Sequence, residues 1–284
     1  MLARIAMQSR QIRTKASQGK SGPAQAIAIG SGVIGLGGLA YSLKHAISPA
    51  DSAMIHNVAV WPKYVKERLS GTFQYCLAGC GVTALGGMAA LRSPTAMRLF
   101  GGSSMMSMFG CIALMMGSGM AVQMVPFNGS PLGGKAALYY LHMGIVGAVI
   151  SPICAAGGPA CLRAAGATLA IMSGLALTGM VAPNDAYISM YGPINAGCFL
   201  MLGACVMSMV APPMGALSMG LQSVVTFGGL ALFTGKGFMD LQKCADRAQQ
   251  PGQFDPINHA LHITMDAINI FIRLVMIMSN GKKK

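Results

Sequence analysis

The sequence predicts an all-α, multi-pass membrane protein of eight spanning helices, and three observations carry that prediction. Charged residues make up 10% of the 284-residue chain, against about 25% in soluble proteins. The hydrophobic fraction is 54%, and apolar runs long enough to cross a bilayer recur along the whole chain. The 38 glycines suit close contact between helices in lipid, where small residues replace the hydrophobic effect as the basis of association.

The first 20 residues predict a mitochondrial targeting segment. They contain five basic residues, three Ser or Thr residues and no acid, and Leu2, Ile5 and Ile12 gather on one side of a helical wheel. A basic tail flanking the membrane is the alternative. With the targeting interpretation, we expect the protein in the mitochondrial inner membrane.

Two segments precede the predicted core. Residues 24–43 form the first apolar run, which we expect to be an additional N-terminal transmembrane helix. Residues 44–69 are the longest polar connection, with Trp61 and Tyr64 among several basic residues. Such a composition suits an amphipathic segment at the lipid headgroups, and a simple loop is the alternative.

Residues 70–279 contain the predicted core of seven transmembrane helices. Pro residues stand in most of the gaps between the apolar runs, where a helix-breaking residue belongs, while Pro152 and Pro159 leave one boundary open. The even total of eight helices places both termini, including the basic tail at 280–284, on one side of the membrane. The seven runs lie at 70–91, 100–125, 136–156, 160–182, 188–211, 215–243 and 257–279.

Several classes of function are disfavoured. The net charge of +13 is scattered over short loops and both ends without an aromatic-interleaved platform, so we expect no nucleic-acid partner. The cysteines lie mostly inside apolar runs without the spacing of a zinc site, and we expect no resident cofactor. The HExxH, GxSxG and Walker patterns are missing, and nothing in the sequence indicates an enzyme.

The stretch from 237 to 273 concentrates the acidic residues, with four of the seven in the chain. If its second half is helical, polar residues at alternating steps of four and three share one face over about 27 Å, nearly the thickness of a bilayer. These residues are Asp255, His259, His262, Asp266, Asn269 and Arg273. An ionised carboxylate is expensive in hydrocarbon, so Asp266, near the middle of this run, must face protein or water.

The preceding run carries a second acid, Asp240, whose polar neighbours Gln222, Thr226 and Lys236 approximately share its helix face. If the two helices are adjacent, Asp240 and Asp266 face each other, and two close carboxylates hold one proton between them. A divalent cation competes with that proton. With Asn269, Thr226, Gln222 and backbone carbonyls, the pair offers oxygen ligands of the type that suits weak, transient Ca²⁺ binding.

A structural role is the alternative for these acids. Lys236 lies four residues before Asp240 and is spaced to neutralise it. A bond between Lys236 and Asp240 favours the structural role. Two carboxylates facing each other, with Lys236 directed away, favour transport.

The C-terminal half resembles the transmembrane Bax inhibitor motif family, in particular its mitochondrial branch. The resemblance rests on LRAAGATLAIMSGLAL, on VAPPMGALSMGLQSVVTFGGLALFTGKGFMDLQKCADRAQ and, above all, on FDPINHALHITMDAINIFIRLVMIM. YCLAGCGVTALGGMAALRS resembles the first core helix of the family more loosely. The resemblance implies a seven-helix core and, at Asp240 and Asp266, the aspartate pair that gates a pH-sensitive Ca²⁺ leak.

The resemblance further implies Ca²⁺/H⁺ exchange, cristae organisation, cytochrome c retention and resistance to apoptosis. This chain departs from the family at Met239, where Tyr is usual, and at Lys236, where an apolar residue is usual. Arg92, Arg98 and Arg163 are candidates for the family's arginine that contacts the pair. We therefore expect a pH-sensitive Ca²⁺ pathway, with Asn269, the histidines, Asp255 and Arg273 as polar lining. The alternative is a non-transporting scaffold for inner-membrane partner proteins.

Overall fold

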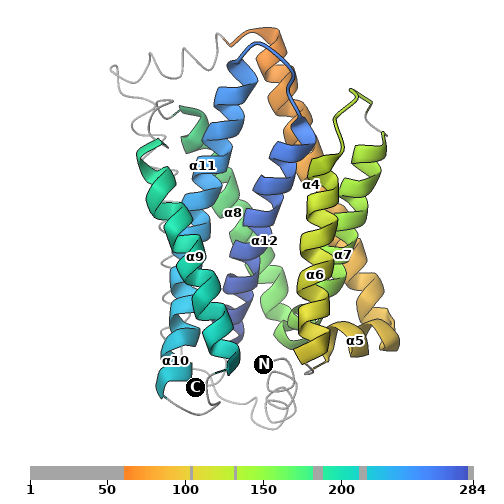
Figure 1. Ribbon diagram of the computed structural model, residues 1–284, viewed down its shortest axis with the longest axis vertical. Helices are drawn as coiled ribbons and strands as arrows, with labels where there is room; N and C mark the ends of the chain where they lie inside the picture. Colours follow the sequence, from red (N-terminus) through yellow and green to blue (C-terminus); the bar gives the residue numbers. More distant parts are fainter. Residues whose placement is uncertain (1–60, 103–104, 131–132, 182–187, 211–215, 281–284) are drawn as a thin grey trace.

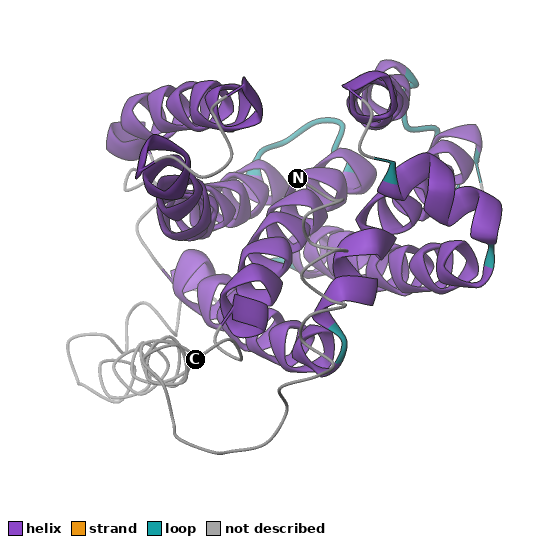
Figure 2. Cartoon of the chain, turned by 90° about the horizontal axis from the view of Figure 1, so that it is seen from below, coloured by secondary structure: helices purple, strands orange, loops and turns teal. Residues whose placement is uncertain are grey.

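The computed structural model describes residues 61–102, 105–130, 133–181, 188–210 and 216–280. Within these ranges every regular element is a helix, and Figures 1 and 2 show the helices as a bundle. In the described part of the chain, six helices are long and apolar enough to cross a membrane. The prediction of an all-α, multi-pass membrane protein is confirmed. The predicted leader, the helix at 24–43 and the tail at 281–284 lie outside the described residues.

Helix α4 (Lys63–Arg92) begins earlier than the predicted start at residue 70. The end of the predicted polar connection, residues 63–69, therefore forms about two turns of a helix rather than a loop. The reason is amphipathicity, because Val65 and Leu69 are buried against Leu241 and Ala248 of the bundle while Lys63 remains exposed.

Helix α4 lies very close to α7 (Gly134–Gly157), and glycine makes that approach possible. A Cβ atom on Gly86 would lie 2.5 Å from the carbonyl oxygen of Gly144, and one on Gly147 would lie 2.0 Å from the carbonyl oxygen of Thr83. Any side chain at these positions would force the two helices apart. The GCGVTALGG stretch of the sequence is thus a helix–helix contact.

The next helices present much apolar surface. After the short α5 (Pro94–Gly101), α6 (Met105–Met124) exposes Met106 and Phe109, and α9 (Ile188–Val210) exposes Phe199 and Leu200. Apolar side chains exposed along whole helices are expected where lipid is the solvent.

Helix α8 (Pro159–Val181) follows α7 directly. The helix boundary that Pro152 and Pro159 left open in the sequence lies at Gly158, which has φ +50°.

The predicted run at 215–243 is a helix with an irregular middle. It consists of α10 (Ala216–Ser223), the π-helical segment η1 (Val224–Gly228) and α11 (Gly229–Gln249). A π-helical turn holds one more residue than an α-helical turn and shifts the faces on either side of it. Gln222 before this segment is exposed, whereas Thr226 within it is buried, so the two side chains have different surroundings.

Helix α12 (Pro256–Asn280) is the central helix of the bundle. It packs against α4, α7, α8 and α11, and Figure 1 shows it between α9 and α11 on one side and α4, α6 and α7 on the other. Ile257, Ala260, Ile270 and Leu274 are almost completely buried in its contacts. The helix that carries the predicted polar stripe is therefore enclosed by protein rather than by lipid.

Candidate functional site

Asp240 on α11 and Asp266 on α12 meet at a single lysine. The ammonium group of Lys236 donates to Asp240 Oδ2 at 2.6 Å, to Asp266 Oδ1 at 2.9 Å and to Asp266 Oδ2 at 3.1 Å. Lys236 precedes Asp240 by one helical turn, so α11 supplies two of the three groups. Adjacent α11 and α12 bring the two acids together as the sequence predicted.

This arrangement has features of both the structural role and the transport role that were considered from the sequence. The lysine is bonded to Asp240, which favours a structural role, yet the same lysine also holds the second carboxylate. The side chains of Asp240 and Asp266 are 12% and 2% exposed. With both acids ionised, two negative charges face one positive charge, so the cluster has room for one further positive charge.

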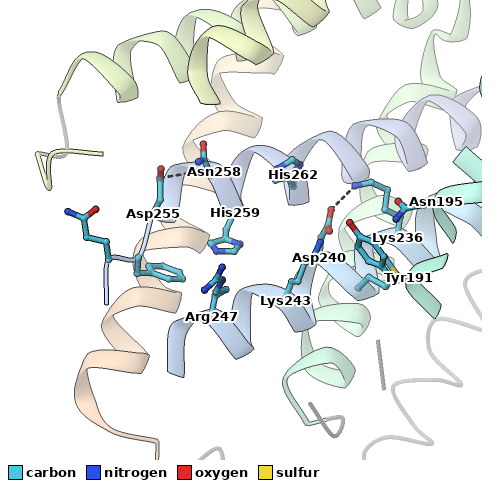
Figure 3. Close-up of a pocket in the computed structure, with 13 residues that line it drawn as sticks. Tyr191, Asn195, Lys236, Asp240, Lys243, Arg247, Asp255, Asn258, His259 and His262 are labelled. Carbon is cyan, nitrogen blue, oxygen red and sulfur yellow. Dashed lines mark hydrogen bonds and ion pairs between the residues drawn. The ribbon is translucent and has the colours of Figure 1, made fainter. Parts of the chain in front are cut away.

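A cavity of about 570 Å³ reaches this cluster from the end of the bundle where α11 meets α12. Figure 3 shows Lys236 and Asp240 at one end of the cavity and Asp255 near the other, with the histidines between them. Asp266 is not part of the cavity wall. The wall is formed by Tyr191, Asn195, Lys236, Met239, Asp240, Lys243, Arg247, Gln253, Phe254, Asp255, Asn258, His259 and His262.

The outer end of the cavity is built around Asp255. Its Oδ1 accepts hydrogen bonds from the backbone N–H groups of Ile257 and Asn258, which caps the first turn of α12. Its Oδ2 forms an ion pair with Lys135 of α7, whose side chain is buried. The nearby His259 stacks on Phe254 with ring centroids 5.1 Å apart. Both carboxylate oxygens of Asp255 are thus bonded, and the side chain links α7 to the start of α12.

The inner part of the predicted stripe does not line this cavity. Asn269 accepts a hydrogen bond from Arg273 on its side-chain oxygen, and its amide donates to the carbonyl oxygen of Met265. The Arg273 guanidinium lies over the ring of Phe233 and is buried. These two residues bind each other and α11, rather than adding to the cavity.

The predicted set of oxygen ligands is only partly assembled. Asn269 is occupied with Arg273, Gln222 is exposed, and Thr226 lies about 20 Å along the helix from Asp240 at 1.5 Å per residue. The described residues contain no group of three or more His, Cys, Asp or Glu side chains that could hold a metal ion. Only the two carboxylates of the proposed Ca²⁺ ligands come together.

Three neighbours of the site were not predicted from the sequence. Tyr191 and Asn195 come from α9, and Lys135 comes from α7. Nothing in the local sequence indicates which distant helix faces α11. Lys135 carried a usable signal, because it is the one charged residue between Gly134 and Gly157, and a lysine in an apolar helix needs a partner.

Comparison with known proteins decides the family. Residues 65–283 match the family described as "Inhibitor of apoptosis-promoting Bax1". The growth hormone-inducible transmembrane protein of Rattus norvegicus is 36% identical over 263 residues, which cover 90% of this chain and 74% of the rat protein. The chain belongs to the Bax inhibitor family.

None of the three candidate arginines contacts the two carboxylates. Arg92, Arg98 and Arg163 are all exposed, and in the described part of this chain the cation bonded to the two carboxylates is Lys236. Lys236, where the resemblance implies an apolar residue, therefore lies between the two carboxylates. Met239, where the resemblance implies Tyr, is buried beside it and contributes to the cavity wall.

Proposed function

We propose that this chain is a proton-sensitive cation pathway of the mitochondrial inner membrane, which releases Ca²⁺ by leak or in exchange for H⁺ and has no enzymatic activity. The observation that carries the proposal is the cavity that ends at Asp240, Lys236 and the shielded Asp266. An intramembrane carboxylate at the end of a cavity is typical of ion and proton pathways. The resemblance described in the sequence analysis implies the same function.

The charges of the site suggest how protons and Ca²⁺ are coupled. Protons and Ca²⁺ compete for the same carboxylates. Acidification favours the protonated carboxyl groups, which do not bind Ca²⁺, so we expect Ca²⁺ flux to fall as the pH is lowered. Lys243 and Arg247 in the cavity wall repel divalent cations, which fits a slow leak rather than a fast channel.

Purified full-length protein in liposomes tests this proposal. Ca²⁺ flux should exceed that of empty vesicles and should decrease between pH 8 and pH 6. Asp266→Asn should flatten the pH dependence because it removes one of the two competing carboxylates. Flux equal to that of empty vesicles at every pH would rule out the transport function.

A scaffold for inner-membrane partner proteins is the second candidate, and the bond between Lys236 and Asp240 favours it. The apolar faces of α6 and α9 offer surface for other membrane helices. In cells lacking the protein, the Asp240→Asn/Asp266→Asn variant should then restore cristae and cytochrome c retention fully. Failure of this variant, with normal expression, would favour transport.

The location is proposed from the leader at residues 1–20. Fused to a fluorescent protein, this segment should direct the fusion to mitochondria, and replacing its five basic residues by Gln should abolish the targeting. Cytosolic fluorescence of the unaltered fusion would contradict the inner-membrane location. The role in resistance to apoptosis is checked by measuring cytochrome c release in cells with and without the protein.

A further inference from the structure

We propose that Lys236 is the specificity-determining residue of this pathway: its ammonium group occupies the position of a transported cation and keeps divalent cations away from Asp266. This inference rests on the proposed cation pathway. It follows from the three hydrogen bonds that Lys236 donates to the two carboxylates and from its place between Asp266 and the cavity.

The ammonium group takes the place that a bound cation would occupy. It lies 2.6 Å from Asp240 Oδ2, 2.9 Å from Asp266 Oδ1 and 3.1 Å from Asp266 Oδ2. Both carboxylates at this end of the cavity therefore bond to the same ammonium group. Because Ca²⁺ binds carboxylate oxygens at about 2.3–2.6 Å, it cannot bind both acids while the ammonium group remains between them.

Lys236 also separates Asp266 from the cavity. Lys236 and Asp240 belong to the cavity wall, whereas Asp266 does not and its side chain is only 2% exposed. A cation arriving through the cavity therefore meets Lys236 before it meets Asp266. The lysine both shields the acid and occupies its oxygens.

Lys236 affects the binding of protons and of divalent cations to the two carboxylates differently. Two carboxylates and one ammonium group leave one negative charge, which a single proton neutralises without moving the lysine. A divalent cation in addition to the lysine would leave an excess positive charge in a poorly solvated place. Lys236 therefore permits proton binding and opposes Ca²⁺ binding.

Displacement of the lysine is the route by which Ca²⁺ gains access. The side chain is 25% exposed, on a flexible stem, and Figure 3 shows Asn195 and Tyr191 of α9 beside it in the same cavity. When the ammonium group leaves the carboxylates, it can thus move toward these polar side chains while α11 stays in place. Replacing Lys236 by an uncharged residue should open the carboxylates to Ca²⁺ permanently.

The test compares wild-type protein with Lys236→Met and Lys236→Arg in liposomes that contain a Ca²⁺ indicator. Lys236→Met keeps the length of the side chain and removes the charge, so Ca²⁺ flux should rise by about ten-fold or more. Lys236→Arg keeps a positive charge beside the carboxylates, so it should not show the gain of flux seen with Lys236→Met. The double variant Lys236→Met/Asp266→Asn should lose the gain.

Ca²⁺-dependent thermal stabilisation of the detergent-purified proteins provides a second readout, because a ligand that binds the native state raises the melting temperature. Ca²⁺ should stabilise Lys236→Met and leave wild-type protein unchanged. Binding by Lys236→Met without flux in any variant would support the role of Lys236 and overturn the transport function.

Equal flux and equal Ca²⁺ stabilisation in wild-type protein and Lys236→Met would overturn the role of Lys236 while leaving the transport function intact. If Lys236→Met does not fold, Lys236→Gln replaces it in both measurements. With either variant, a folded protein that shows no Ca²⁺ binding and no gain of flux would contradict the inference.

Discussion

The buried side chains of Asp240 and Asp266 are stabilised by the positive charge of Lys236. Asp266 is buried, and its cation comes from the neighbouring helix through Lys236. Removing one partner of a buried ionic group is costly because the remaining charge is left without compensation. The cluster contains two acids and one base, so the consequences of removing an acid and removing the base are not equal.

We therefore predict different stabilities for two variants of this cluster. Asp266→Asn leaves Lys236 and Asp240 as a one-to-one pair and should lower the free energy of unfolding by less than Lys236→Met does. Lys236→Met leaves two buried acids without a cation and should cost about 3–5 kcal/mol in the absence of Ca²⁺. Thermal denaturation in detergent without Ca²⁺ gives the comparison, and equal losses would contradict the charge balance.

The sequence predicted the acids of this site better than their surroundings. Asp240 and Asp266 stand out because carboxylates are rare in apolar helices, and Lys236 lies one turn from Asp240. Tyr191 and Asn195 were missed because their positions depend on how α9 packs against α11. A contact between distant helices leaves no periodic signal within either one.

At the scale of helices, the apolar runs in the sequence predicted where the helices are, but not the residues at which they begin or the places where they are irregular. Helix α4 begins at Lys63 because Val65 and Leu69 extend its buried face beyond the apolar run. The π-helical segment η1 lies between Gln222 and Lys236, and a π-helical turn breaks the regular 3.6-residue period from which a shared face was predicted. The errors thus lie where a helix is amphipathic or irregular.

The contact between α4 and α7 leads to a prediction with a matched control in the same helix. Gly86→Ala places a methyl group against the backbone of Gly144 and should destabilise the protein by about 1–3 kcal/mol. A methyl group added at Gly81 would meet no atom within 4 Å, so Gly81→Ala should be neutral or slightly stabilising. Denaturation of both variants in detergent is the measurement, and equal stability would contradict the close contact.

The end of α11 is held by a residue of α4. The Arg68 guanidinium donates to the carbonyl oxygens of Ala248, Gln250 and Gly252 at 3.1, 2.8 and 2.7 Å. Arg68→Ala should therefore increase hydrogen exchange of residues 248–256, because these carbonyls lose a charged donor. Lys63→Ala removes only an exposed ion pair with Glu67 and serves as the control. Unchanged exchange in Arg68→Ala would contradict this role.

For the whole molecule, the long helices of the described part alternate in direction along the chain, with α10 continuing into α11 (Figure 1). The loop between α6 and α7 lies at the opposite end from the C-terminal end of α12. Helix α11 is not among the six described helices that are long and apolar enough to cross a membrane. Its final turns carry several charges, which include Lys243 and Arg247. Together with the segment at 24–43, we expect eight crossings.

This topology predicts where three tags become accessible. A tag after residue 20 and a tag after residue 284 should show the same protease protection in mitochondria stripped of their outer membrane. A tag at Gly129, in the exposed loop between α6 and α7, should show the opposite protection. Opposite protection of the two terminal tags would indicate an odd number of crossings.

The bonds from Arg68 to the turn between α11 and α12 also constrain the order of assembly. They join positions about 180 residues apart, so Arg68 has no partner at this turn until α11 and α12 are in place. The carboxylate of Asp266 is likewise supplied by α12. A partly assembled bundle without α12 therefore lacks both this turn and the second acid, and the pathway exists only once α12 has been inserted.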